Sequence, residues 1–143
     1  MIEIVVVLAL FSILLSIAAP KVNIFNSIKE KQELRAFKSD ILHARNRAIV
    51  ESKKYTVYLN YENNSYDISY NVSNTKSVII KEYKFQYGIK FVRNPRLKAI
   101  EFTSSGTVSI ADTLTIVDSK NNIYELSIGV NTGKITLRSI NWG

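Results

Sequence analysis

The sequence predicts an α+β fold in which one long N-terminal helix packs on antiparallel β-sheets. Residues 1–20 are almost entirely apolar, and residues 21–54 place apolar side chains three or four positions apart, as an amphipathic helix does. From residue 55 on, apolar and polar side chains alternate, as in half-buried strands. We therefore expect a transmembrane or filament-core helix over residues 1–20, an amphipathic continuation over residues 21–54, and an antiparallel β domain over residues 55–143.

The first segment carries a single charge, on Glu3. At about 1.5 Å per residue, twenty helical residues span roughly 30 Å, which is the thickness of the hydrocarbon core of a bilayer. A carboxylate near one end of such a helix marks either the point where the helix enters water or a contact with a partner. Pro20 lacks a backbone donor, so we expect a kink there.

Two other interpretations of this segment are a cleaved secretory signal and an ordinary signal anchor. A secretory signal has a basic region before a shorter apolar core. Here the first basic residue is Lys21, and the first charge is acidic. We therefore favour a helix that stays part of the protein.

The second helical segment is expected to continue to about residue 52 and to pack on the β domain through one apolar stripe. The stripe consists of Ile24, Ile28, Leu34, Phe37, Ile41, Ala44, Ala48 and Ile49. The charged side chains between these positions are expected to form a solvated face: Lys29, Glu30, Lys31, Glu33, Arg35, Lys38 and Asp40. Arg45 and Arg47 are expected to cover the helix–sheet seam with their aliphatic stems while their charged heads reach water.

Seven or so short strands should follow this helix. Residues 55–61 and 66–72 alternate on either side of the turn Glu62-Asn63-Asn64, which predicts a β-hairpin. Further alternating runs lie near residues 78–91, 100–102, 108–110, 114–116, 124–128 and 135–137. Gly106 and Gly133 lie in the turns between them, where we expect positive φ angles.

The composition excludes several classes of site. The 143 residues include no cysteine and one histidine, so disulfides, thiolate metal sites and His-cluster metal sites are ruled out. There is no Gly-x-Ser-x-Gly elbow and no Walker loop, and we expect neither enzymatic activity nor a cofactor. The net charge of +7 permits an acidic partner such as nucleic acid or anionic lipid.

The N-terminal segment resembles the first helix of type IV pilins and pseudopilins. The resemblance lies in Ile2-Glu3-Ile4-Val5-Val6-Val7-Leu8-Ala9 and in Pro20, seventeen residues after the glutamate, as in that family. The family's mature chain opens Phe-Thr-Leu-Ile-Glu, so Met1 falls on its third position, and the Gly-Phe processing site is missing. We expect a misassigned start or a truncation, or else a chain that is not processed.

Three stretches of the β domain narrow the resemblance to minor pseudopilins of the GspH/FimT type. They are residues 43–49, with Ala-Arg-Asn-Arg-Ala-Ile, residues 100–108, with Phe102 and Gly106, and residues 123–135, which end in Gly-Lys-Ile. The resemblance implies a subunit of a type IV pilus, a competence pilus or a type II secretion pseudopilus. It implies leader cleavage, N-methylation and no small-molecule substrate.

The same resemblance implies where the protein resides and what Glu3 does. The chain would cross the bacterial cytoplasmic membrane once, with its C-terminal domain outside, and would then enter a cell-surface or periplasmic filament. Its partners would be other pilins or pseudopilins, bound through the N-terminal helix, with Glu3 neutralising the N-terminal amine of a neighbouring subunit. An unrelated membrane-anchored β-rich domain is a separate interpretation.

A DNA-binding minor pilin, acting as a receptor in DNA uptake, is the alternative function. Five cations without an acid lie between Tyr83 and Ile100, and a basic loop of this kind neutralises phosphates. Some FimT-type proteins are DNA receptors with a C-terminal Gly-Arg-x-Arg turn; here Thr136 replaces the second arginine. The candidate DNA-binding residues are Lys84, Lys90, Arg93, Arg96, Lys98, Lys134 and Arg138, and the competing interpretation is that they form solvated faces.

Overall fold

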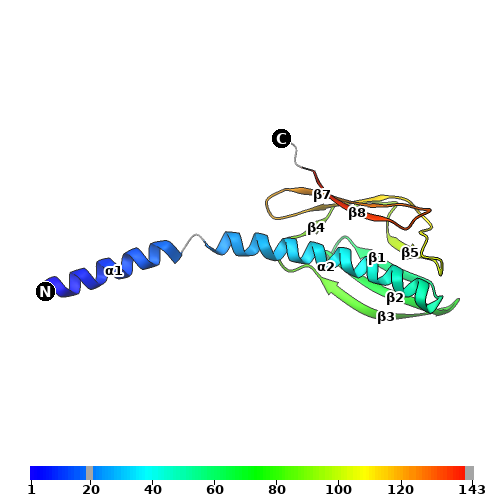
Figure 1. Cartoon of the computed structure of the whole chain (residues 1–143), viewed down its shortest axis with the longest axis horizontal. Helices are drawn as coiled ribbons and strands as arrows, with labels where there is room; N and C mark the ends of the chain where they lie inside the picture. The colour runs from blue at the N-terminus through cyan, green and yellow to red at the C-terminus, as the bar shows by residue number, and fades with distance from the viewer. Residues whose placement is uncertain (19–20, 141–143) are drawn as a thin grey trace.

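The computed structural model describes residues 1–18 and 21–140, in which two helices precede eight strands. Helix α1 is Ile2–Ala18 and α2 is Lys21–Glu51, so α2 ends one residue before its predicted end. The C-terminal part of α2 lies along the sheets, whereas α1 extends beyond them (Figure 1). The kink predicted at Pro20 lies outside the described residues. Within the described ranges, neither helix combines the length and the apolar character that crossing a bilayer requires.

The first sheet contains the predicted hairpin. Its strand order is β3-β2-β1-β5, with all neighbours antiparallel, and the strands are Tyr55–Asn60 (β1), Ser65–Ser73 (β2), Lys76–Lys84 (β3) and Ala99–Phe102 (β5). Tyr55 lies opposite Tyr70 and Asn60 opposite Ser65, so the hairpin closes around residues 61–64. Asn64 has a φ of 49°, which an asparagine tolerates better than most residues.

The second sheet has the order β4-β6-β7-β8, also antiparallel. Its strands are Lys90–Phe91 (β4), Thr113–Val117 (β6), Ile123–Ile128 (β7) and Ile135–Ile140 (β8). A long helix packed on two antiparallel sheets confirms the predicted α+β class. The chain moves from the first sheet to the second after β3 and returns for β5 (Figure 1).

Two predicted strands are wrong in detail. The alternating run near residues 78–91 is divided, because the chain leaves the first sheet after Lys84 and turns at Gly88, whose φ is 105°. The run at residues 108–110 forms only one isolated bridge, between Phe102 and Val108. Val108 is buried while Ile110 is 53% exposed, so this apolar spacing marks one side chain in the core rather than a strand.

The core forms where one side of α2 meets both sheets. Phe37 lies at its aromatic centre, with ring centroids 4.7 Å from Tyr66, 5.7 Å from Phe85 and 5.4 Å from Phe91. Contacts of this kind add to the stabilisation from apolar burial. The predicted apolar stripe packs over Leu34, Phe37, Ile41, Ala44 and Ala48. By contrast Ile24, Ile28 and Ile49, predicted for the same stripe, are exposed.

The prediction that the charged side chains of α2 face solvent is wrong for two acids. Glu30 and Glu33 are 2% and 4% exposed. The Glu33 carboxylate accepts hydrogen bonds from the Tyr83 hydroxyl at 2.7 Å and from the Gln86 backbone N–H at 2.9 Å. Glu30 accepts one from the Ser119 N–H at 3.2 Å. The loops that wrap the helix donate to both acids, and for Glu33 these bonds offset the cost of removing a carboxylate from water. Glu30 is compensated through one oxygen, since among the described residues its Oε2 atom is buried without a hydrogen-bond partner.

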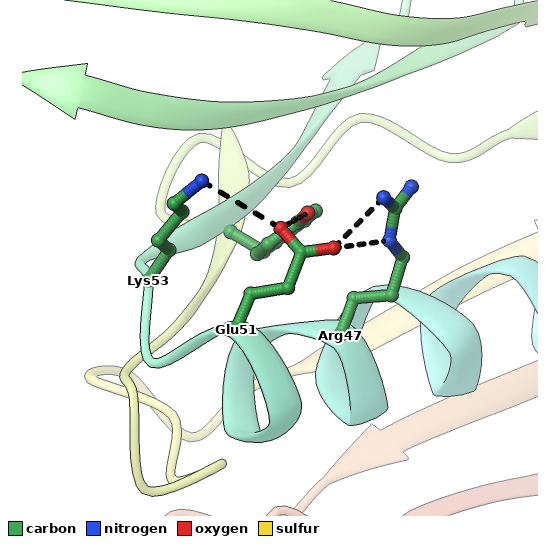
Figure 2. A network of polar contacts seen from close by, with 4 residues as sticks. Arg47, Glu51 and Lys53 are labelled. Carbon is green, nitrogen blue, oxygen red and sulfur yellow. Dashed lines mark hydrogen bonds and ion pairs between the residues drawn. The ribbon is translucent and has the colours of Figure 1, made fainter.

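A polar network joins the end of α2 to the start of β1 (Figure 2). The Glu51 carboxylate accepts from the Tyr55 hydroxyl at 2.8 Å and from Arg47 Nε at 2.9 Å, and Lys53 Nζ lies 3.9 Å away. The hydrogen bond from Tyr55 and the Arg47 guanidinium together lower the pKa of Glu51, against the opposing effect of burial. Burial and the same hydrogen bond raise the pKa of Tyr55 to about 12.

The lowered pKa of Glu51 predicts a loss of stability in acid. A carboxyl whose pKa is lower in the folded than in the unfolded state stabilises the fold above its unfolded pKa, here 4.5. That contribution disappears as pH falls below 4.5 and through the lower folded value. We expect Glu51→Gln to reduce the fall in unfolding free energy between neutral and acidic pH, measured by urea titration at a series of pH values.

The matched control is Glu62→Gln, which changes an exposed acid in the β1–β2 turn. It should leave the pH dependence of the wild type intact. If Glu51→Gln and wild type lose stability in parallel on acidification, the Glu51 network does not contribute to the acid sensitivity.

Candidate assembly and nucleic-acid surfaces

Helix α1 presents apolar side chains on every side. All residues from 1 to 16 are exposed, and apart from Glu3 the polar side chains among them belong to Ser12 and Ser16. Each serine hydroxyl donates to the backbone carbonyl four residues earlier, Leu8 at 2.8 Å and Ser12 at 2.9 Å, which removes its need for water. A helix that is apolar all round is stable only when lipid or protein covers it.

Glu3 lies in the first turn of this apolar helix. A negative side chain is favoured there because the helix N-terminus carries partial positive charge. Within the described part of the chain its carboxylate forms no ion pair. The assembly role predicted for Glu3 stays a prediction.

Three cations, in α2, in the α2–β1 connection and in the first sheet, have acidic partners within the fold. Arg47 pairs with Glu51 at 2.8 Å, and Lys54 pairs with Glu101 at 2.7 Å. Lys81 Nζ lies 2.6 Å from the Asp40 carboxylate, which also accepts from the Tyr66 hydroxyl at 2.5 Å. These positive charges are therefore not free to bind a ligand.

Arg45 differs from its sequence-based interpretation, in which its charged head reached water. Its Nε donates to the Gly106 carbonyl at 3.0 Å, and its Nη2 donates to the Thr132 carbonyl at 2.9 Å. One guanidinium thus connects the loop after β5 and the turn between β7 and β8 to the helix. The planar guanidinium holds its donors in a fixed geometry, so it can bind two carbonyl groups at once.

Gly106 and Gly133 allow this close approach. Their φ angles are 76° and 56°, which confirms the predicted positive values. A Cβ on Gly106 would come within 2.5 Å of the Ile49 side chain, and one on Gly133 would overlap the Gly106 carbonyl oxygen. Replacing Gly133 would displace the Gly106 carbonyl that Arg45 contacts, and replacing Gly106 would displace the Ile49 side chain and strain the backbone at a positive φ.

The structure places the seven candidate DNA-binding residues at four separate locations. All seven are exposed, and across residues 1–18 and 21–140 none of them forms an ion pair. Lys84 ends β3 in the first sheet, and Lys90 lies in β4 at one edge of the second sheet. Three cations share the connection between β4 and β5: Arg93, Arg96 and Lys98.

Lys134 and Arg138 lie away from the other candidates. Arg138 is in β8, at the opposite edge of the second sheet from β4, and Lys134 is in the turn before it. The strand register sets Arg138 directly opposite Glu125, so a negative charge faces it across the strands. The C-terminal pair thus forms a weaker cationic surface than the β4–β5 connection.

The β4–β5 connection is held rigidly on the first sheet. Leu97 is 1% exposed and inserts into the core, and its carbonyl accepts a hydrogen bond from the Tyr61 hydroxyl. The Leu97 N–H donates to the Asn94 carbonyl at 3.2 Å, and the Leu59 N–H donates to the Lys98 carbonyl at 3.0 Å. The charged side chains project from a turn whose backbone is already ordered, so binding would cost little further entropy there.

The exposed aromatic side chain near this turn is Tyr58, which is distant in sequence from the basic residues. Phe91, which lies between the basic residues in sequence, is 6% exposed and belongs to the core. Tyr58 lies in β1 and is 44% exposed. The alternation of β1 places Tyr58 on the outer side of the sheet, opposite to Val57 and Leu59. The sequence pattern of β1 therefore indicated an exposed tyrosine, but in a strand far from the basic residues in sequence.

The described residues contain no group of three or more acidic, histidine or cysteine side chains that could hold a metal ion. No family model and no curated protein matches the sequence.

The fold, however, is similar to solved structures. The minor pseudopilin EpsH from the type 2 secretion system of Vibrio cholerae matches with a TM-score of 0.62 and 14% identity, covering 76% of this chain and 95% of that one. The type IV minor pilin FimU of Pseudomonas aeruginosa strain PAO1 matches with a TM-score of 0.62 and 16% identity, covering 80% and 97%. The chain therefore has the pilin-like fold of minor pseudopilins and minor pilins, as its motifs predicted.

The Arg45 contacts predict a large effect of a single truncation. Arg45→Ala removes two charged hydrogen bonds and leaves two carbonyl groups to find other donors, so we expect a loss of about 2 kcal/mol in unfolding free energy. Arg35→Ala is the matched control, because Arg35 is exposed on the same helix and should cost far less. Urea titration measures both, and equal losses would show that the Arg45 contacts do not stabilise the fold.

Proposed function

We propose that this chain is a minor pilin or pseudopilin, a structural subunit of a type IV pilus, competence pilus or type II secretion pseudopilus. The observation that carries the proposal is the combination of a pilin-like domain with an N-terminal helix that is exposed and apolar on all sides. Such a helix requires a covering environment, and two environments can supply it in succession. Lipid of the bacterial cytoplasmic membrane covers it before assembly, with the β domain outside, and neighbouring pilin helices cover it in the filament.

The apolar surface continues past α1 into the start of α2, which extends the proposed packing surface. Ile24 is 61% exposed, Phe25 is 58% exposed and Ile28 is 49% exposed, and the domain core begins only near Leu34. In this proposal neighbouring helices bury these side chains, and Glu3 pairs with the N-terminal amine of an adjacent subunit. That pair would set the stagger between subunits, because other staggers leave a carboxylate unpaired in an apolar surrounding.

Glu3→Leu tests the assembly role. Leaving a buried cation without its partner costs about 3–5 kcal/mol, so we expect incorporation into filaments to fall tenfold or more while membrane insertion is retained. The measurement is immunoblotting of sheared filaments and of membrane fractions from cells that express the variant with its native assembly components. Ser12→Leu, which changes a polar residue elsewhere on α1, is the control. Incorporation of Glu3→Leu at the wild-type level would contradict the role of Glu3.

A DNA-binding minor pilin, acting as a receptor in DNA uptake, is the second candidate. One specific observation favours it: three unpaired cations project from the ordered β4–β5 connection, whereas the cations of α2 and the first sheet named above are bound within the fold. Cations without internal partners can neutralise phosphates without breaking an existing contact.

Salt dependence tests this candidate. With duplex DNA, each phosphate contact contributes about 0.9 to the slope of log affinity against log salt, so replacing Arg93, Arg96 and Lys98 by alanine should reduce the slope by about 2 to 3. The control replaces Lys31, Arg35 and Lys38 on α2 by alanine, which removes the same net charge and should change the slope far less. Electrophoretic shifts at several salt concentrations provide the measurement. Absence of binding by the wild type at low salt excludes the DNA-binding function.

A further inference from the structure

A groove of about 910 Å³ lies between the outer side of the first sheet and the β4–β5 connection. Tyr58, Asn60 and Asp67 line it from the sheet, and Arg93, Pro95 and Lys98 line it from the connection. Its size suits a ligand of one or a few small units rather than a protein surface. Pro95 and Lys98 also line a second groove that includes Arg96, so a ridge separates two adjoining depressions.

The Tyr58 ring is accessible from within this groove. The strand register places Asp67 on one side of it and Ala99 on the other. Alanine has only a methyl group, so the β5 side of the ring is not covered by a larger neighbour across the strands. An aromatic ring held on a strand and open to solvent is a stacking platform for a planar ligand.

The groove also divides its charges between two walls. Arg93 and Lys98 are positive on the wall formed by the connection, and Asp67 is negative on the wall formed by the sheet, with Glu62 in the β1–β2 turn. A ligand that is only anionic would be repelled by the acidic wall. A ligand with phosphates on one side and amino groups on the other would satisfy both walls, since carboxylates accept hydrogen bonds from amino groups.

Burial and the neighbouring Glu82 raise the pKa of Asp67, which indicates that the Asp67 carboxylate is poorly compensated by the rest of the fold. Asp67 lies opposite Glu82 in the strand register, so two acids are adjacent on the outer side of the sheet. A hydrogen-bond donor from a ligand would relieve this unfavourable arrangement.

We propose that this groove binds single-stranded DNA, with a base stacked on Tyr58 and its amino edge toward Asp67, while phosphates contact Arg93 and Lys98. The ridge at Pro95 and Lys98 lets the strand continue into the second groove, where Arg96 meets the next phosphate. Single strands fit because their bases present free faces and edges, whereas a duplex stacks the faces and pairs the edges. The inference rests on the DNA-binding candidate function and specifies the form of DNA.

The test measures fluorescence anisotropy of a labelled twelve-nucleotide single strand and of the matching duplex, with the full chain in nonionic detergent. Loss of one stacked base weakens binding by roughly fivefold to a hundredfold, so we expect Tyr58→Ala to weaken single-strand binding by about tenfold or more. Tyr58→Phe keeps the ring and should bind as the wild type does. Duplex binding should be weaker than single-strand binding and nearly unchanged by Tyr58→Ala.

The possible results separate the inference from the function on which it rests. If the chain binds both DNA forms equally and Tyr58→Ala changes neither, the single-strand inference is wrong and DNA binding itself stands. If neither form binds at low salt, both are wrong. Because Tyr58 lies on the surface, circular dichroism should show that Tyr58→Ala folds as the wild type does; weak single-strand binding by a folded Tyr58→Ala then supports the inference.

Discussion

The arrangement of the domain depends on one side of α2 serving both sheets at once. From Leu34 to Ala48 its apolar side chains fill the space between the sheets, and Phe37 contacts rings from β2, β4 and the segment after β3. Polar contacts at two levels of the helix fix the loops around this core. Glu33 holds the segment after β3, and Arg45 holds the loop after β5 and the turn before β8. The sheets share no strand, and the helix packs against both of them.

Periodicity predicted the parts of the fold that depend on local pattern, and it did less well where a tertiary contact decides. The α2 stripe, the β1–β2 hairpin and the positive φ angles at Gly106 and Gly133 all follow from spacing and turn chemistry. Glu30 and Glu33 look like solvated positions because charge is usually exposed, and only the loops that donate to them explain their burial. Val108 resembles a strand residue because one buried side chain beside exposed neighbours gives the same alternation.

For the candidate binding residues too, the sequence predicted which residues lie together only where they share one short segment. A run of cations in sequence predicted Arg93, Arg96 and Lys98 together, and the structure keeps them together because they share one short, anchored connection. Lys134 and Arg138 are close in sequence to each other, yet the strand order puts them at the far edge of the second sheet. The sequence does not show that Tyr58 lies near the cations, because only the pairing of β1 with β5 in the folded chain brings its strand beside Lys98.

The two proposed surfaces differ in their physical character, which allows one protein to carry both. The helical surface is apolar, with Glu3 as its one charge, and apolar association persists when salt is added. The β4–β5 connection is cationic and exposed, and its attraction for phosphates weakens steeply as ionic strength rises. A filament would therefore remain assembled under conditions that release DNA from its subunits. Charge changes in the connection should alter ligand binding without altering assembly, because effects at distant sites without shared partners are nearly additive.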